Sequence, residues 1–177
     1  MSYEKKVAAG EVPATIVFYY LTDTIFNSVQ LRSVFRARSV KDQGGVSQLD
    51  DVSISPDEKS FIVEVLAQAM YDIFSAMFKM TDTVTENTIT VNALYTPTAG
   101  VEKLYSTGKI KNNAAYNASV LQTIDKKIEN CIRYFILTEW YVVCGMGDDA
   151  KINAGKYQEY LRDVKNLTFQ LRKPLIS

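Results

Sequence analysis

The segment from Ala114 to Cys144 constrains the fold most, because apolar residues recur at helical spacing along it. The residues at that spacing are Leu121, Ile124, Ile128, Cys131, Ile132, Phe135, Ile136, Trp140 and Val143. The other side of the second half is filled by Tyr134, Leu137, Tyr141 and Val142. A helix that is apolar on every side is buried on every side. In a chain of 177 residues, this pattern suggests a contact with another subunit.

Three other segments carry helical patterns. The first runs from Asp23 to Arg38. The second begins at Ser55-Pro56-Asp57-Glu58, which combines a serine N-cap, a proline at the first position and a glutamate at the third, a capping box. It extends for roughly six turns with a broad apolar face. The third follows Gly145-Met146-Gly147, starts at Asp148-Asp149 and ends at Pro174, so it should form an antiparallel αα-hairpin with the helix before it.

Two segments have the composition of β-strands. Residues 16–20 are β-branched and aromatic, which fits a short strand or an extended lead-in. From Thr88 to Tyr95, one alternating set consists of Ile89, Val91, Ala93 and Tyr95 and the other of Thr88, Thr90, Asn92 and Leu94, which predicts a strand. A single strand cannot satisfy its own backbone groups, so this strand must pair with residues 16–20 or with another subunit. The connection from Thr96 to about Asn113 is polar.

These elements predict a mainly α fold: a helical bundle with a long C-terminal αα-hairpin and a β element of one or two strands, paired within the chain or between subunits. We expect a flexible N-terminal arm over residues 1–13, a single domain over residues 14–173 and a C-terminal tail over residues 174–177.

The absence of histidine removes the commonest general base, metal ligand and pH-sensitive side chain. The remaining soft ligands, Cys131 and Cys144, fall thirteen residues apart on one predicted helix. At 1.5 Å per residue they lie roughly 20 Å from each other, beyond the reach of a disulfide. Two thiols alone cannot build a structural zinc site. The sequence therefore predicts buried reduced cysteines, no catalytic residues, no metal site and no cofactor.

The charges are balanced, with 20 basic and 20 acidic residues, so bulk charge favours neither nucleic acid nor an anionic membrane. The most apolar run, Cys131 to Met146, contains Arg133 and Glu139 and is too short and too charged to span a bilayer. We therefore expect no membrane partner. A near-neutral surface also permits copies of the chain to assemble.

Three groups of residues are candidates for contacts, and each has an ordinary alternative. Trp140 and Tyr141, with Leu137, fit core packing or an intersubunit hot spot. The C-terminal residues fit a frayed end or docking onto a partner, and they include Arg172, Lys173, Leu175 and Ile176. A basic cluster fits a solvated helix end or a contact with acidic protein or DNA phosphate, and it consists of Arg32, Arg36, Arg38 and Lys41.

The order of the parts resembles the small neck proteins of tailed bacteriophages, the head–tail connector or adaptor class. The resemblance covers roughly residues 15–175. It lies in the entry Leu21-Thr22-Asp23 into a helix, the run Ile54 to Glu58 into a long apolar helix, and a strand with its loop. It continues through Trp140-Tyr141, a Gly-Asp-Asp break and the ending Leu171 to Pro174. It is a match of layout and a few positions.

The resemblance implies a ring of identical subunits, with twelve as the expected number, docked beneath the portal protein of the virion neck and assembled in the host cytoplasm. Such a ring extends the channel for the packaged DNA, which it contacts non-specifically, and supports the tail or a second neck protein. The function is structural, without a reaction. Surface arguments assign subunit or portal contacts to Leu137, Trp140 and Tyr141 and to the C-terminal residues given above.

Two other functions remain open from the residues alone. One is a small helical protein-binding or regulatory module without enzymatic activity. The other is an enzyme that uses only Asp, Glu, Lys and Tyr, although no paired-carboxylate spacing stands out. The association state of the purified protein separates the assembly protein from the binding module.

Overall fold

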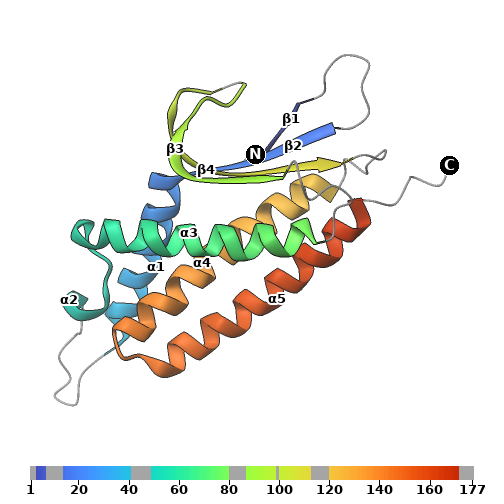
Figure 1. Ribbon diagram of the computed structural model, residues 1–177. Helices are drawn as coiled ribbons and strands as arrows, with labels where there is room; N and C mark the ends of the chain where they lie inside the picture. The colour runs from blue at the N-terminus through green and yellow to red at the C-terminus, as the bar shows by residue number, and fades with distance from the viewer. Residues whose placement is uncertain are drawn as a thin grey trace.

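The computed structural model describes residues 3–6, 14–40, 49–79, 87–98, 100–112 and 120–171. In these parts, four long helices form one layer and a small antiparallel sheet lies over it (Figure 1). The long helices are α1 (Thr22–Ser39), α3 (Lys59–Phe78), α4 (Leu121–Val143) and α5 (Gly147–Leu171). Two short segments precede α3, namely α2 (Leu49–Val52) and the 3-10 turn η1 (Pro56–Glu58). The prediction of a mainly helical fold is confirmed.

The sheet contains four strands in the order β1-β2-β4-β3, each antiparallel to its neighbours. The strands are β1 (Tyr3–Lys6), β2 (Ala14–Leu21), β3 (Thr88–Tyr95) and β4 (Lys103–Asn112). Each of these described strands has a partner strand in the same chain. The prediction of one or two strands was therefore wrong. β3 pairs with β4 and not, as expected, with residues 16–20 or with a second subunit, and it forms one edge of the sheet.

Two strands lie where the sequence predicted none. Residues 103–112 were expected to be a polar connection but form β4, the partner of both β2 and β3. Residues 3–6 fall in the expected flexible arm but form β1, which pairs with β2 from Tyr3 opposite Phe18 to Lys6 opposite Thr15. In both cases the pairing depends on a neighbouring strand rather than on local apolar alternation, because backbone groups make the ladder.

One face of the sheet packs on α3. Ile16, Phe18 and Tyr20 alternate along β2 and are almost fully buried, as is Ile110 of β4. The rings of Phe18 and Phe74 lie 6.1 Å apart between their centroids. This alternation places the core between the sheet and the helices (Figure 1).

The predicted capping box is present at the start of α3. The Ser55 hydroxyl accepts a hydrogen bond from the Asp57 amide at 3.2 Å, and the Glu58 carboxylate accepts one from the Ser55 amide at 2.6 Å. The first turn after Ser55 is a 3-10 turn, and the α-helix continues from it. In the described part of the chain, the segment Pro56–Phe78 alone has the length and apolar composition of a membrane-crossing helix, which core helices also have.

The C-terminal helix pair packs more extensively than any other two elements. Cys144 to Met146 connect α4 to α5, and the helices run in opposite directions, since Lys127 contacts Asp163 while Phe135 contacts Tyr157. The described part of α4 starts at Leu121, and the expected first turns, residues 114–119, lie outside the described residues. The other sides of α4 contact α1 and α3.

Leu137, Trp140 and Tyr141 lie in the core of the single chain, at 3%, 7% and 3% exposure. The indole Nε1 of Trp140 donates a hydrogen bond to the Val52 carbonyl at 2.7 Å, and the ring packs against Phe61. Of the two alternatives for these residues, core packing is the one observed, so the assignment of a subunit contact to them is not supported. One chain covers its own apolar helix because α1, α3 and α5 surround it.

Candidate interaction surfaces

The described arginines of the predicted basic cluster contact other side chains of the same chain. Arg36 makes a two-pronged contact with Asp149 at the start of α5, with Nε 2.8 Å from Oδ1 and an Nη nitrogen 2.9 Å from Oδ2. The guanidinium of Arg32 lies over the ring of Tyr134 on α4, 5.3 Å from its centroid. Both residues thus contact the chain's own helices. Arg38 lies 6.0 Å from the ring centroid of Phe35, and Lys41 is outside the described residues.

Cations and tyrosines interleave where α1, α4 and α5 meet. The rings of Tyr134 and Tyr160 stack, with centroids 5.5 Å apart and planes 11° from parallel. Lys156 lies 5.3 Å from the Tyr134 centroid, and Lys127 lies 4.8 Å from that of Tyr160. We call Arg32, Lys127, Tyr134, Lys156 and Tyr160 the cation–tyrosine cluster. Lys156 and Tyr160 are one turn apart on α5, so the cluster follows from helical spacing.

The members of this cluster differ in their ionic partners. Lys127 pairs with Asp163 at 2.6 Å, and that hydrogen bond raises the pKa of the lysine. Within the described ranges, neither Arg32 nor Lys156 has a carboxylate within 4.0 Å. Burial raises the pKa of Tyr134, but its hydrogen bond with Arg32 and the charges of Lys156 and Arg32 outweigh burial, so the net pKa is lowered. The cluster is therefore a site of unbalanced positive charge.

An apolar patch covers the outer side of the β3–β4 hairpin. Leu94 and Leu104 are direct cross-strand partners, and Val101 lies in the connection between the strands. These three side chains are 67%, 47% and 70% exposed, respectively. We call them the hairpin patch. Exposed apolar side chains that adjoin each other on a monomer are typical of a protein contact.

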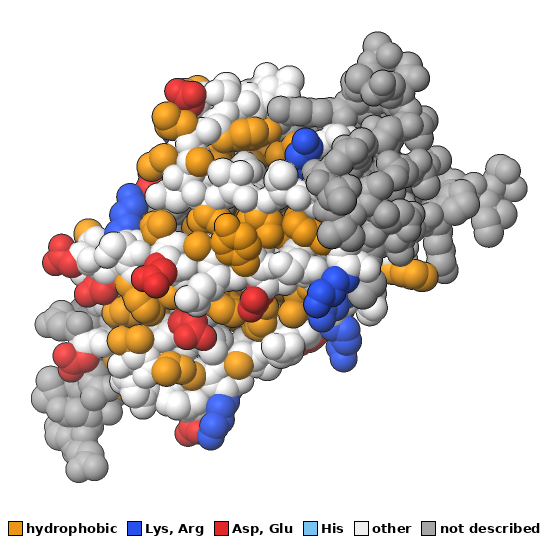
Figure 2. Space-filling model, in the orientation of Figure 1, with side chains coloured by type: hydrophobic (Ala, Val, Ile, Leu, Met, Phe, Trp, Pro, Cys, Tyr) orange, Lys and Arg blue, Asp and Glu red, His pale blue; other side chains and the backbone are white. Residues whose placement is uncertain are grey.

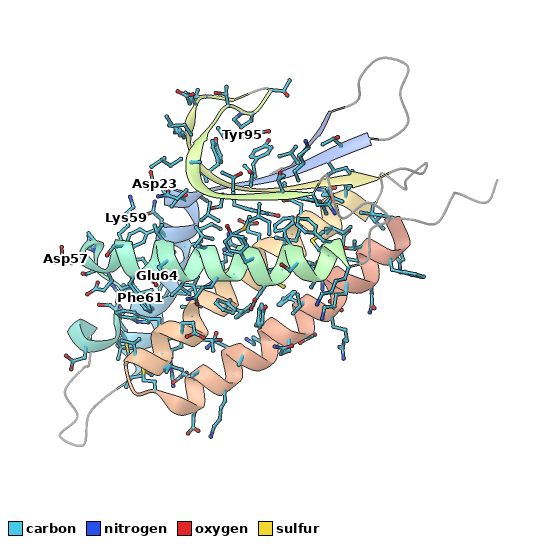
Figure 3. All side chains as sticks on the ribbon, viewed as in Figure 1. Asp23, Asp57, Lys59, Phe61, Glu64 and Tyr95 are labelled. Atoms are coloured by element: carbon cyan, nitrogen blue, oxygen red, sulfur yellow. The ribbon has the colours of Figure 1, made fainter. Side chains whose placement is uncertain are left out.

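Three tyrosine rings pack together on the other side of the hairpin from the hairpin patch. The rings of Tyr19, Tyr95 and Tyr105 contact one another, with centroids 5.7 to 6.0 Å apart. Figure 3 shows Tyr95 inside the curl of the hairpin. Because neighbouring residues in a strand point to opposite faces, Leu94 points outward. The curl follows a bulge between Thr90 and Ala93, where Asn92 has a φ of 48°.

Other exposed apolar side chains lie on the helices. Leu31 and Phe35, one turn apart on α1, are 57% and 60% exposed. Val142, Val143 and Ile152 flank the connection between α4 and α5 and are also exposed. We call the last three the turn patch. The tip of the hairpin and the α4–α5 turn lie at opposite ends of the molecule in Figure 1, so the hairpin patch and the turn patch are separate surfaces.

A buried tyrosine links the sheet to α4. The Tyr20 hydroxyl donates a hydrogen bond to the Asp125 carbonyl at 3.4 Å, and both side chains are nearly inaccessible. Burial, followed by the Asp125 charge, raises the pKa of Tyr20 well above its ordinary value. A tyrosine whose proton is held so firmly is suited to structure rather than to acid–base chemistry near neutral pH.

The sequence predicted only part of these surfaces. The spacing of Arg32 and Arg36 placed them on one face of a helix, but the hairpin patch was not predicted. Leu94, an apolar residue at a position that alternates with Ala93 and Tyr95, is the sequence signal that could have indicated it. Arg172, Lys173, Leu175 and Ile176 lie outside the described residues. In the described stretches, no group of three Cys, Asp or Glu side chains is arranged to hold a metal ion.

No protein-family model, curated protein or solved structure matches this chain.

Proposed function

We propose that this chain is a structural subunit of a ring in the neck of a tailed phage, a head–tail connector that links the portal protein to the tail and lines the DNA channel. The proposal joins the layout of the sequence, which resembles that class, to one structural observation. That observation is the presence of two separate apolar surfaces, the hairpin patch and the turn patch, on one chain.

Two different surfaces at opposite ends favour a head-to-tail contact between copies. In a heterologous contact, one surface of a subunit meets a different surface of the next subunit, and the array closes into a ring when the rotation permits. We place the hairpin patch on the protruding side of this contact, because three contacting tyrosine rings pack against the hairpin and should limit its conformational freedom. Binding then costs less ordering entropy than it would for a loose loop.

The features that support assembly in the structure are not those that the sequence suggested. The apolar end of α4 is covered within one chain, and β3 pairs with β4, so neither demands a second copy. The proposal depends instead on the exposed hairpin patch and turn patch. In this proposal the helices form the bundle at the body of the subunit, with α4 and α5 as its αα-hairpin, and the C-terminal residues after Leu171 reach the portal protein.

The test is the association state of the purified full-length chain, alone and with the portal protein of a tailed phage, by mass photometry and negative-stain imaging. We expect rings whose formation is lost in Leu94→Glu/Leu104→Glu. Thr96→Glu is the matched control, because Thr96 is exposed beside the same hairpin and is not part of the hairpin patch. A chain that stays monomeric with the portal protein present contradicts the proposal and favours the small helical binding module.

A further inference from the structure

We infer that the cation–tyrosine cluster receives acidic side chains from the exposed face of α3 of a neighbouring copy, so that opposite charges set the orientation of copies in the ring. The inference rests on the proposed assembly of copies and goes further by naming the two surfaces that meet. The occupant is a second copy of this chain, because the chain carries one basic and one acidic face.

The first face concentrates cations that have no carboxylate of their own in the described part of the chain. Arg32 on α1 and Lys156 on α5 approach the same Tyr134 ring, each 5.3 Å from its centroid. The two cations are therefore separated by no more than twice that distance. The neighbouring cations Arg36 and Lys127 are already paired with Asp149 and Asp163. A carboxylate brought to this face by another molecule would offset the remaining charge.

The second face belongs to α3 and the turn before it. Glu64 and Asp72 are two steps of four residues apart, so they lie on one row of the helix together with Gln68. All three are exposed, and within the described ranges the two carboxylates have no cation within 4.0 Å. Asp57, seven residues before Glu64, is also exposed and lies in the 3-10 turn that precedes α3. Figure 3 shows Asp57 and Glu64 at the same end of α3, and Figure 2 shows acidic side chains gathered on this face.

The two faces lie on different sides of the molecule. Arg32 contacts Tyr134 where α1 meets α4, whereas Phe61 of α3 contacts Trp140 on another side of α4. In Figure 1, α3 lies in front and α1 lies behind it. A single chain cannot join its own two faces, but two chains in a head-to-tail contact can. Such a contact is heterologous, which is the class of contact that the two apolar patches also favour.

The overall charge balance favours a second copy over nucleic acid as the occupant. The chain has 20 basic and 20 acidic residues, so the cations of one face are matched by carboxylates elsewhere on the same chain. Complementary charges on a surface of zero net charge steer orientation and reject wrong contacts without attracting polyanions at long range. DNA binding by the cluster is a distinct outcome of the test below.

The test is charge reversal on each face of the full-length chain. Arg32→Glu/Lys156→Glu and Glu64→Lys/Asp72→Lys should each weaken self-association about tenfold or more, as measured by sedimentation velocity across concentrations. An equimolar mixture of the two variants should recover association, because every contact between two unlike variants joins opposite charges when the two alternate along the array. Arg162→Glu is the control, since Arg162 is exposed on α5 and outside the cluster.

The outcomes separate the inference from the proposed function. If wild-type rings form and the charge-reversed variants form them equally well, the inference is wrong while the ring proposal stands. If the wild-type chain never associates, both fail. If Arg32→Glu/Lys156→Glu assembles normally but loses binding to a fluorescent DNA duplex, the cluster serves nucleic acid and the inference is overturned. Arg32→Gln/Lys156→Gln, checked by circular dichroism, repeats the measurement should the reversed variant fail to fold.

Discussion

Gly108 of β4 lies directly against the ring of Phe74 of α3. A Cβ atom added at Gly108 would lie 2.1 Å from Cε1 and 2.2 Å from Cζ of that ring. Gly108 is also the cross-strand partner of Phe18, whose ring contacts Phe74. The missing side chain therefore sets how closely the sheet approaches the helical layer, and the fully buried Phe74 fills the space that the glycine leaves.

Gly108→Ala should lower the free energy of unfolding by about 1–3 kcal/mol, the usual cost of overpacking a core. The Phe74 ring is fully buried and would overlap the added methyl group, so the ring or the sheet must shift within the packed core. Urea unfolding followed by circular dichroism measures the change. Gly155→Ala is the control, because nothing lies within 4 Å of a Cβ there, and alanine in α5 should be neutral or stabilise by up to about 1 kcal/mol. Equal stability of both variants would contradict the packing.

Trp140→Phe should destabilise the chain by about 1–3 kcal/mol, because the Val52 carbonyl loses the indole donor that lies 2.7 Å away in the core. Tyr71→Phe is the control, since Tyr71 is more than half exposed and its change should cost less than about 0.5 kcal/mol. Trp140 is the single tryptophan in the sequence, so its fluorescence gives a second measurement. Blue-shifted emission in the native wild type is expected, and water-like emission would place the indole outside the core.

The parts of the fold that could be predicted from sequence are those specified locally. The capping box at Ser55 and Glu58 needs residues only three positions apart, and the structure confirms it. The helices were recognised from apolar spacing within each segment. By contrast, Lys103 to Asn112 contains few apolar residues, and its strand forms because β2 and β3 supply partners on both sides. This pairing cannot be predicted from the residues of the segment alone.

The candidate surfaces were harder to predict for a related reason. Apolar periodicity showed that Trp140 is buried but could not show which chain buries it, and the covering residues Val52 and Phe61 are distant in sequence. Likewise, the spacing of Arg32 and Arg36 placed them on one face, but their partners Tyr134 and Asp149 come from helices about a hundred residues later. In both cases, contacts between residues far apart in the sequence determine what surrounds the side chain.

The capping box should make stability depend on acid. The hydrogen bond from Ser55 lowers the pKa of Glu58 below its ordinary value of 4.5. A lowered carboxyl pKa means that the stabilisation is present above the ordinary pKa and is lost as the pH falls through the lowered one. Glu58→Gln should therefore lose stability at pH 7 and approach the wild type below about pH 4. Urea midpoints from pH 7 to pH 3 measure this.

A second variant and a control test the contribution of the capping box to stability. Ser55→Ala removes the hydroxyl that caps the helix, and should cost about 1 kcal/mol at pH 7. Asp57→Asn is the control, because the Asp57 side chain is exposed and its amide, not its carboxylate, makes the capping contact. A difference between wild type and Glu58→Gln that stays constant across the whole pH range would show that ionised Glu58 does not stabilise the turn.

The two cysteines should differ in reactivity toward Ellman's reagent. Burial raises the pKa of Cys131 to about 12, so at pH 8 its thiol is protonated as well as inaccessible. Cys144, at the end of α4, is only partly buried, although burial also raises its pKa. We expect slow labelling of one thiol in the native chain and of the second only in denaturant. Cys144→Ala should abolish the native phase, whereas Cys131→Ala should keep it. Native labelling of Cys131 at the rate of the unfolded chain would show that α4 is not buried by α1, α3 and α5.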